Sequence, residues 1–148
     1  MNVEKTLKTD KQIPLGSKSI IHLILTSNKI TEEMAHTLKP FDVSGQQFNV
    51  LRILRGQNGK PANLCTLNER MITKMSNTTR LVDKLLLKGY VHRVVCPINR
   101  RKIEITITPE GSIALEQMDK AVNDLEKSIL KGFTQKELET LNGLLDKF

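Results

Sequence analysis

Aromatic side chains are scarce in this chain of 148 residues, at 3% of the total, with no Trp and a single Tyr. Proteins that bind single-stranded nucleic acid stack its bases on aromatic rings, so the composition argues against that class. The two cysteines, Cys65 and Cys96, are too few for a disulfide framework. The longest apolar run, from Ile20 to Leu25, is interrupted by His22, falls far short of the about 20 residues of a membrane span, and has no signal-peptide cleavage site. We therefore expect a cytoplasmic protein without a membrane segment.

Positive charge, by contrast, is abundant and unevenly distributed. Hydrophobic residues make up 39% of the chain and charged residues 26%, as in a globular protein, and the formal net charge is +7. Residues 70–102 contain nine Lys and Arg against one acidic residue, Asp83, whereas residues 103–148 contain five basic and nine acidic residues. Charge that only keeps a protein soluble would be spread along the chain. Its concentration in one third favours contacts with phosphates.

Signals of helix ends divide the N-terminal part of the chain. Apolar residues at helical spacing predict a helix over residues 17–38, which Pro40 ends. Ser44 and Gln47 form a capping box, in which each side chain bonds to the other residue's backbone N–H. It predicts a second helix, which ends at Gly56.

Two consecutive helices are expected next. A capping box at Thr66 and Glu69 predicts a short helix over residues 66–72. A further helix is expected to begin within residues 73–76 and to end at Gly89, with its apolar face formed by Leu81, Val82 and Leu85. Two helices joined by a tight turn are typical of a helix-turn-helix, whose second helix enters the major groove of DNA.

A hairpin and two more helices complete the chain. Residues 90–96 and 102–107 are strand-like, and the second run alternates Ile with polar residues, as in a half-buried strand. Thr108 precedes Pro109 at the start of a long helix, and a third capping box begins a last helix at Thr134. We predict a mainly α fold with a small β-hairpin wing, a winged helix-turn-helix.

The exposed residues of the second helix and the hairpin are the candidate DNA contacts. Arginine is the commonest reader of guanine and asparagine suits adenine. A solvated basic face is the alternative reading of the helix alone, but the two arginines at the hairpin tip lie in the same basic segment. The predicted DNA-binding residues are Lys74, Ser76, Asn77, Thr79, Arg80 and Lys84 of the helix, and Arg100, Arg101 and Lys102 of the hairpin.

Three stretches of this region resemble the MarR family of bacterial transcription regulators. They are residues 76–91, which contain SNTTRLVDKL and KGYV, the Asn99-Arg100-Arg101 tip, and the TITPEG sequence at 106–111. The likeness covers about residues 41–145. One departure is Asn99, which stands where the family usually has Asp and which can hold the turn through its side-chain amide.

The resemblance implies a homodimeric winged-helix protein that binds pseudo-palindromic double-stranded DNA. Its recognition helix would span residues 76–88, and Arg101 would enter the minor groove. The helices at 17–38, 109–131 and 134–147 would form the dimer interface. It also implies a repressor released by a small, often aromatic, anion or by oxidation. The domains expected are a dimerisation region at 1–40, the winged helix-turn-helix at 41–108 and C-terminal dimerisation helices at 109–148.

Other candidate sites are weaker. His22 could line an effector pocket near the dimer interface, although a partly buried helix histidine is the commoner outcome. Cys96 lies close in sequence to several arginines, so it is a better candidate than Cys65 for a redox-active thiol, with a packed thiol as the alternative. We find no metal-ligand set, cofactor motif or catalytic pair and expect no enzyme activity. The alternative functions are a winged-helix protein-interaction module without DNA readout and a thiol-based redox-responsive regulator.

Overall fold

Within residues 2–73, 77–95 and 103–148, which the computed structural model describes, the chain forms seven α-helices, one 3-10 helix and a two-stranded sheet. In chain order the elements are α1 (Val3–Thr6), α2 (Leu15–Leu38), η1 (Lys39–Phe41), α3 (Gly45–Arg55), α4 (Leu64–Arg70), α5 (Thr78–Leu87), β1 (Val91–Val95), β2 (Ile103–Ile107), α6 (Pro109–Leu130) and α7 (Gln135–Leu145). The prediction of a mainly α fold with a small β-hairpin is confirmed.

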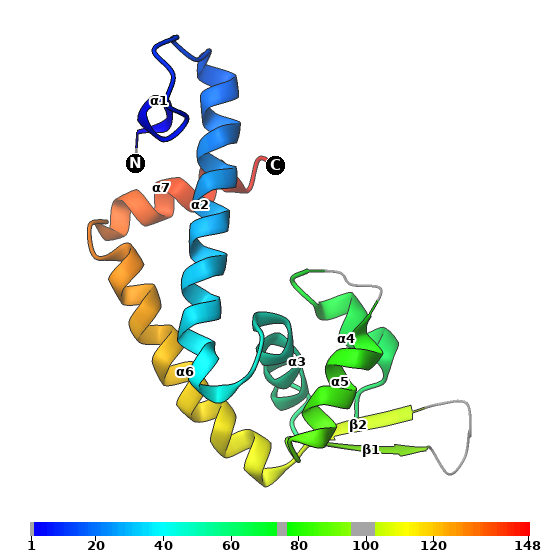
Figure 1. Cartoon of the computed structure of the whole chain (residues 1–148). Helices are drawn as coiled ribbons and strands as arrows, with labels where there is room; N and C mark the ends of the chain where they lie inside the picture. Colours follow the sequence, from blue (N-terminus) through cyan, green and yellow to red (C-terminus); the bar gives the residue numbers. More distant parts are fainter. Residues whose placement is uncertain (1, 74–76, 96–102) are drawn as a thin grey trace.

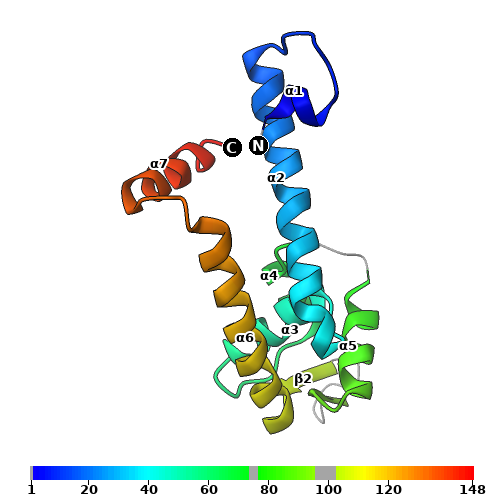
Figure 2. The ribbon, with the colours of Figure 1, turned by 60° about the vertical axis from the view of Figure 1, so that its left-hand side comes forward.

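The helices and the hairpin are arranged as a lobe with two long helices leading away from it. Figure 1 shows α3, α4, α5 and the hairpin gathered in the lobe, while α2 and α6, which contact each other, extend toward α1 and α7. Figure 2 shows α7 standing apart from α2 at the far end of α6. At the end of the molecule opposite the lobe, α7 and α2 of the same chain are therefore not closely packed.

The hydrophobic core lies in the lobe and draws on the first half of α6. Fully buried side chains include Leu51 of α3, Leu85 of α5, Ile105 of β2, and Leu115 and Met118 of α6. In contrast, α7 buries none of its residues. α6 supplies part of the core and then continues out of it, so α6 joins the core of the lobe to the opposite end of the molecule.

Backbone pairing ties the hairpin to the loop between α3 and α4. β1 and β2 pair in antiparallel register, with Val91 opposite Ile107 and Val95 opposite Ile103. Ala62 N donates to the Ile105 carbonyl at 2.9 Å, and Ile105 N donates to the Ala62 carbonyl at 2.8 Å. The sequence did not predict this bridge, which fixes the base of the wing against the lobe.

Most of the predicted helix caps are confirmed. In the first capping box, Ser44 N donates to Gln47 Oε1 at 2.8 Å and Gln47 N donates to Ser44 Oγ at 3.2 Å. The box at the start of α7 has the same reciprocal bonds, between Thr134 and Glu137. At the start of α6, Thr108 Oγ1 accepts a hydrogen bond from the backbone of the third helical residue.

The predicted capping box at Thr66 and Glu69 is wrong. The N-cap of α4 is Asn63, whose Oδ1 accepts a hydrogen bond from Thr66 N at 2.9 Å. The helix therefore starts at Leu64 and ends at Arg70. Asparagine is a stronger N-cap than threonine, and it stands three residues earlier, so Thr66 becomes the third residue of the helix.

Two other predictions are also corrected. α5 begins at Thr78, later than the predicted start within residues 73–76. Its buried face includes Thr78, which is 3% exposed, while Leu81 is only half-buried. The four-residue helix at Val3–Thr6 was not predicted, since so short a segment cannot reveal a helical period.

The start of α6 lies directly on the backbone that follows α5. Thr108 N donates to the Tyr90 carbonyl at 3.0 Å, and Thr108 Oγ1 donates to the Gly89 carbonyl at 2.7 Å. A Cβ on Gly111 would lie 2.1 Å from the Tyr90 carbonyl oxygen, closer than atoms can approach. Only glycine allows this crossing, because the neighbour is backbone and cannot rotate away.

Gly111→Ala should therefore destabilise the protein by about 1–3 kcal/mol, the usual cost of forcing extra atoms into a packed site. Urea unfolding followed by circular dichroism measures the change. Gly16→Ala is the matched control, because Gly16 lies in α2 with no atom near the added Cβ. Equal unfolding midpoints for the two variants would refute the close approach.

Candidate nucleic-acid interface

α5 has one buried face and one exposed face. Thr78, Val82 and Leu85 are buried at helical spacing against the lobe. At 100° per residue, Arg80 and Lys84 fall on the opposite side and both are exposed. The helix is thus held by its apolar side and presents a polar, basic side to solvent.

The turn that leads into α5 is anchored at two points. Thr78 Oγ1 donates a hydrogen bond to Asn68 Oδ1 of α4. Before the turn, Ile72 N donates to Asn49 Oδ1 of α3 at 3.0 Å, and the Met71 side chain is buried. These bonds join α4 and α5 to α3, so the N-terminal end of α5 has a fixed position in the lobe.

The single acidic residue of the basic segment is already paired. Asp83 Oδ1 accepts from Arg93 of β1 at 2.5 Å. Both side chains are partly exposed, so the pair adds at most about 1 kcal/mol to stability. Its consequence is electrostatic, because the carboxylate is matched locally and leaves the positive charge of Arg80 and Lys84 uncompensated on the exposed face of α5.

Comparison with known proteins bears on what such a face does. A sequence model of the MarR family matches residues 43–103, from α3 to the wing. The multiple antibiotic resistance protein MarR of Salmonella typhimurium is 30% identical over 139 residues, which span 91% of this chain and 90% of that protein. This chain belongs to the MarR family of transcription regulators. The HTH-type transcriptional repressor IacR of Pseudomonas putida is 27% identical over 118 residues, or 80% of this chain and 70% of that repressor.

Solved structures of transcription regulators share the fold. A cysteine-to-serine variant of MarR from E. coli, complexed with operator DNA, superposes with a TM-score of 0.74 at 28% identity and covers 99% of this chain and 98% of that one. The organohalide-sensing regulator RdhR superposes with a TM-score of 0.82 at 17% identity, covering 92% of this chain and 80% of that one. The lobe is therefore a winged helix-turn-helix, in which α4 and α5 form the helix-turn-helix and β1 and β2 the wing.

The predicted contact residues of this MarR-family chain divide into two groups. Asn77, Thr79, Arg80 and Lys84 are all exposed at or on α5. Thr79 lies toward the side of Asp83, while the other three share one side of the helix. The rest of the predicted set lies outside the described residues: Lys74, Ser76, Arg100, Arg101 and Lys102.

The weaker candidates are not part of this face. His22 is half-buried in the N-terminal half of α2, near Glu4. There the Lys18 ammonium donates a hydrogen bond to Glu4 Oε1 at 2.8 Å and holds the pKa of that carboxyl below its usual range. Cys65 is exposed on α4, and Cys96 lies outside the described residues.

Neither a metal-ion site nor a membrane span is found among the described residues. No group of three His, Cys, Asp or Glu side chains there could hold a metal ion. No helix among the described residues is long and apolar enough to cross a membrane.

Sequence reasoning missed the residues that position α5 from other elements. Besides Asn49 and Asn68, these include Asp42, whose Oδ2 lies 2.6 Å from Lys88 Nζ at the C-terminal end of α5. The hydrogen bond from Lys88 holds the pKa of Asp42 below its usual range. Asp42 has a left-handed backbone, with φ of 50°. The sequence does show an Asp just after the expected end of the first long helix. Nothing in it points to the contact with Lys88, because the two residues are 46 positions apart.

Proposed function

We propose that this MarR-family regulator binds pseudo-palindromic duplex DNA as a homodimer, with α5 in the major groove and the wing at the adjacent minor groove or backbone. The observation that carries the proposal is the exposed basic face of α5, opposite the buried Val82 and Leu85. A B-form major groove admits one α-helix, and the N-terminal residues of a recognition helix reach the base edges.

The residue types on that face suit distinct roles. Arg80 can bond two acceptors of guanine, and Asn77 can form paired bonds with adenine. Ser76 and Thr79 suit phosphate or base contacts, and Lys74 and Lys84 suit phosphates. On the wing we assign Arg101 to the minor groove, with Arg100 and Lys102 beside the backbone. The chain would act as a repressor, as the name of the related IacR describes for that protein.

Dimerisation is supported by the apolar surface left at the end of the molecule opposite the lobe. Ile20, Leu23 and Ile24 follow helical spacing along α2 and are 37–54% exposed. On α7, Leu141, Leu144 and Leu145 are 38–53% exposed. An exposed apolar face of a helix is stabilised when a second protein surface covers it and removes it from water. We assign this surface to a second copy and keep residues 1–40 and 109–148 as the dimerisation regions that flank the winged helix at 41–108.

A small-molecule effector would act through the cleft between α2, α3 and α6. The cleft has a volume of about 440 Å³, a size that suits a small organic ligand. Met34, Phe48 and Val122 line it together with the Arg52 guanidinium, which lies 5.7 Å from the centre of the Phe48 ring. An aromatic carboxylate would match this combination. It lowers DNA affinity only if it prefers a conformation with the wrong spacing of the two α5 helices.

The proposal is tested by duplex binding and its salt dependence. If the dimer neutralises about 6–10 phosphates, affinity should fall about 10³–10⁵-fold between 50 and 200 mM salt. Binding sites are selected from fragments of the source genome and sequenced, with two half-sites expected about 34–36 Å apart. No retardation of any duplex at low salt would refute DNA binding.

Arg80→Ala and Arg101→Ala should each weaken binding to a selected duplex by about 1–3 kcal/mol per half-site, the cost of losing a base contact. Fluorescence anisotropy measures the affinities at fixed salt. Lys120→Ala is the charge-matched control, on the exposed side of α6. If Arg80→Ala or Arg101→Ala affects affinity no more than the control, that residue has no role in readout.

Ile24→Asp should convert the dimer to a monomer, because dimerisation would then bury an unpaired carboxylate. Light scattering after gel filtration should fall from about twice to once the 16.8 kDa chain mass. Ile72→Asp, on the exposed turn before α5, is the control and should remain dimeric. A monomeric parent protein would contradict the proposed assembly.

For the effector, aromatic carboxylates such as benzoate should lower duplex affinity, and Arg52→Met should reduce that response. The anisotropy titration is repeated over a panel of such acids at constant ionic strength. The assignment of the cleft fails if Arg52→Met responds to an active acid as strongly as the parent protein does.

A further inference from the structure

The cleft assigned to the effector shares a wall with the turn that leads into α5. Besides residues of α2, α3 and α6, its lining includes Met71, Ile72 and Thr73, which directly follow α4. Asn49 of α3 lines the same cleft, and its Oδ1 accepts the hydrogen bond from Ile72 N at 3.0 Å. Both residues of this anchoring bond therefore line the cleft.

The turn is the wall of the cleft with the least support. The other walls are helices, each held by its own ladder of backbone hydrogen bonds. Met71 is buried, and its N–H donates to the Leu67 carbonyl at 3.0 Å, but the next side chain, Ile72, is 87% exposed and adds little packing. The bond from Ile72 N to Asn49 is itself open to solvent. Segments with few apolar contacts and exposed hydrogen bonds open at the lowest cost in free energy.

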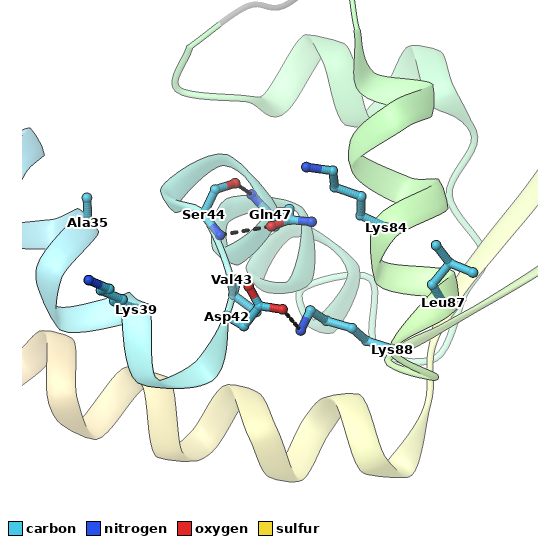
Figure 3. A pocket seen from close by; sticks show the side chains of 9 residues that line it. All are labelled: Ala35, Lys39, Asp42, Val43, Ser44, Gln47, Lys84, Leu87 and Lys88. Atoms are coloured by element: carbon cyan, nitrogen blue, oxygen red, sulfur yellow. Dashed lines mark hydrogen bonds and ion pairs between the residues drawn. The ribbon is translucent and has the colours of Figure 1, made fainter.

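The anchor at the other end of α5 lies outside the effector cleft. Lys88 Nζ donates to Asp42 Oδ2 at 2.6 Å, and both residues line a separate cleft that faces the C-terminal half of α5 (Figure 3). The Thr78–Asn68 hydrogen bond is outside the effector cleft as well, since neither residue lines it. A ligand in the effector cleft therefore meets only the Asn49 anchor of α5 among these three.

Asn49 also lies within reach of the group that suits the effector's carboxylate. Arg52 is three residues further along α3, so the two side chains are neighbours on one side of the helix, and both line the cleft. Asn49 Nδ2 donates no hydrogen bond to any described residue. A carboxylate accepts hydrogen bonds and donates none, so it attracts this amide nitrogen and not Oδ1.

We propose that Asn49 is a positioning residue that couples the effector cleft to α5. In the free protein its Oδ1 holds the turn before α5. A carboxylate bound at Arg52 accepts a hydrogen bond from Asn49 Nδ2, which turns the amide and withdraws Oδ1 from Ile72 N. The turn then opens, and α5 loses an anchor at its N-terminal end. This inference rests on the proposed function and adds the route by which its effector acts.

Two substitutions of Asn49 should differ in duplex affinity without acid and agree in their lack of response to it. Asn49→Ala removes the acceptor, so affinity should fall about 5–150-fold, because one amide hydrogen bond changes an equilibrium about 2–12-fold and a dimer has two. Asn49→Asp keeps an acceptor for Ile72 N and should restore the affinity that Asn49→Ala loses. Neither variant has the Nδ2 donors, so benzoate or another active acid should no longer change the anisotropy titration of either.

Two controls separate coupling from a merely structural role. Asn68→Ala breaks another anchor of α5 outside the cleft, so it should weaken duplex binding and keep the parent's fold-change with acid. Asn58→Asp, in the exposed loop after α3, repeats the charge change of Asn49→Asp away from the cleft and should behave as the parent protein does. An acid response in Asn49→Ala as large as that of Asn68→Ala refutes the coupling.

Hydrogen exchange of the Ile72 amide, followed by NMR, tests the same coupling without DNA. In the parent protein, benzoate should speed this exchange and shift the amide signal of Gly45, which lines the same cleft. In Asn49→Asp the exchange should stay slow when benzoate is added. In Asn49→Ala it should be fast with or without benzoate.

The outcomes distinguish this inference from the function on which it rests. A Gly45 shift with unchanged Ile72 exchange overturns the inference and leaves the effector cleft in place. If no acid of the panel shifts Gly45, the effector assignment itself is wrong, and the inference fails with it. If the parent protein binds no duplex, the proposed DNA binding fails, and the exchange of Ile72 alone decides the inference.

Discussion

The burial of one face of α5 is the constraint on which the rest of this structure depends. A short helix has little stability alone, so its position must come from packing. Val82 and Leu85 are fully buried against the lobe, and the Thr78–Asn68 hydrogen bond fixes the rotation at the N-terminal end. With that face held, the polar groups on the other face are presented in one orientation. A DNA reader needs such rigidity because its contacts depend on register.

The position of α5 is also tied to the long helices. At its C-terminal end, Lys88 contacts Asp42 at the junction of η1 and α3. α3 is joined to α6 by the ion pair between Arg55 and Asp119, and α6 starts on the backbone at Tyr90. A change in the angle between α2 and α6 would therefore move α5 as well. The proposed effector would act through this connection to alter the spacing of the two recognition helices in the proposed dimer.

The sequence predicted local structure well because each local signal lies within a few consecutive residues. The capping boxes at Ser44 and Thr134 each need only four consecutive residues, and the basic face of α5 follows from helical period alone. Where two residues could each be the N-cap, as Asn63 and Thr66 could for α4, the helical period does not show which of them starts the helix. The contact of Lys88 with Asp42 joins residues far apart in the chain, so no pattern in either segment reveals it. The fold class and much of the candidate face were thus predictable, and the anchors that orient α5 were not.

The sharing of α6 between the lobe and the opposite end limits how this chain can be divided. Leu115 and Met118 complete the lobe's core, although they follow the wing in sequence. During synthesis the lobe cannot finish folding until the first half of α6 has left the ribosome. A lobe excised after Thr108 would expose the apolar surface that these two residues cover. The winged helix therefore cannot be transferred as a separate unit, because it folds together with the first half of α6.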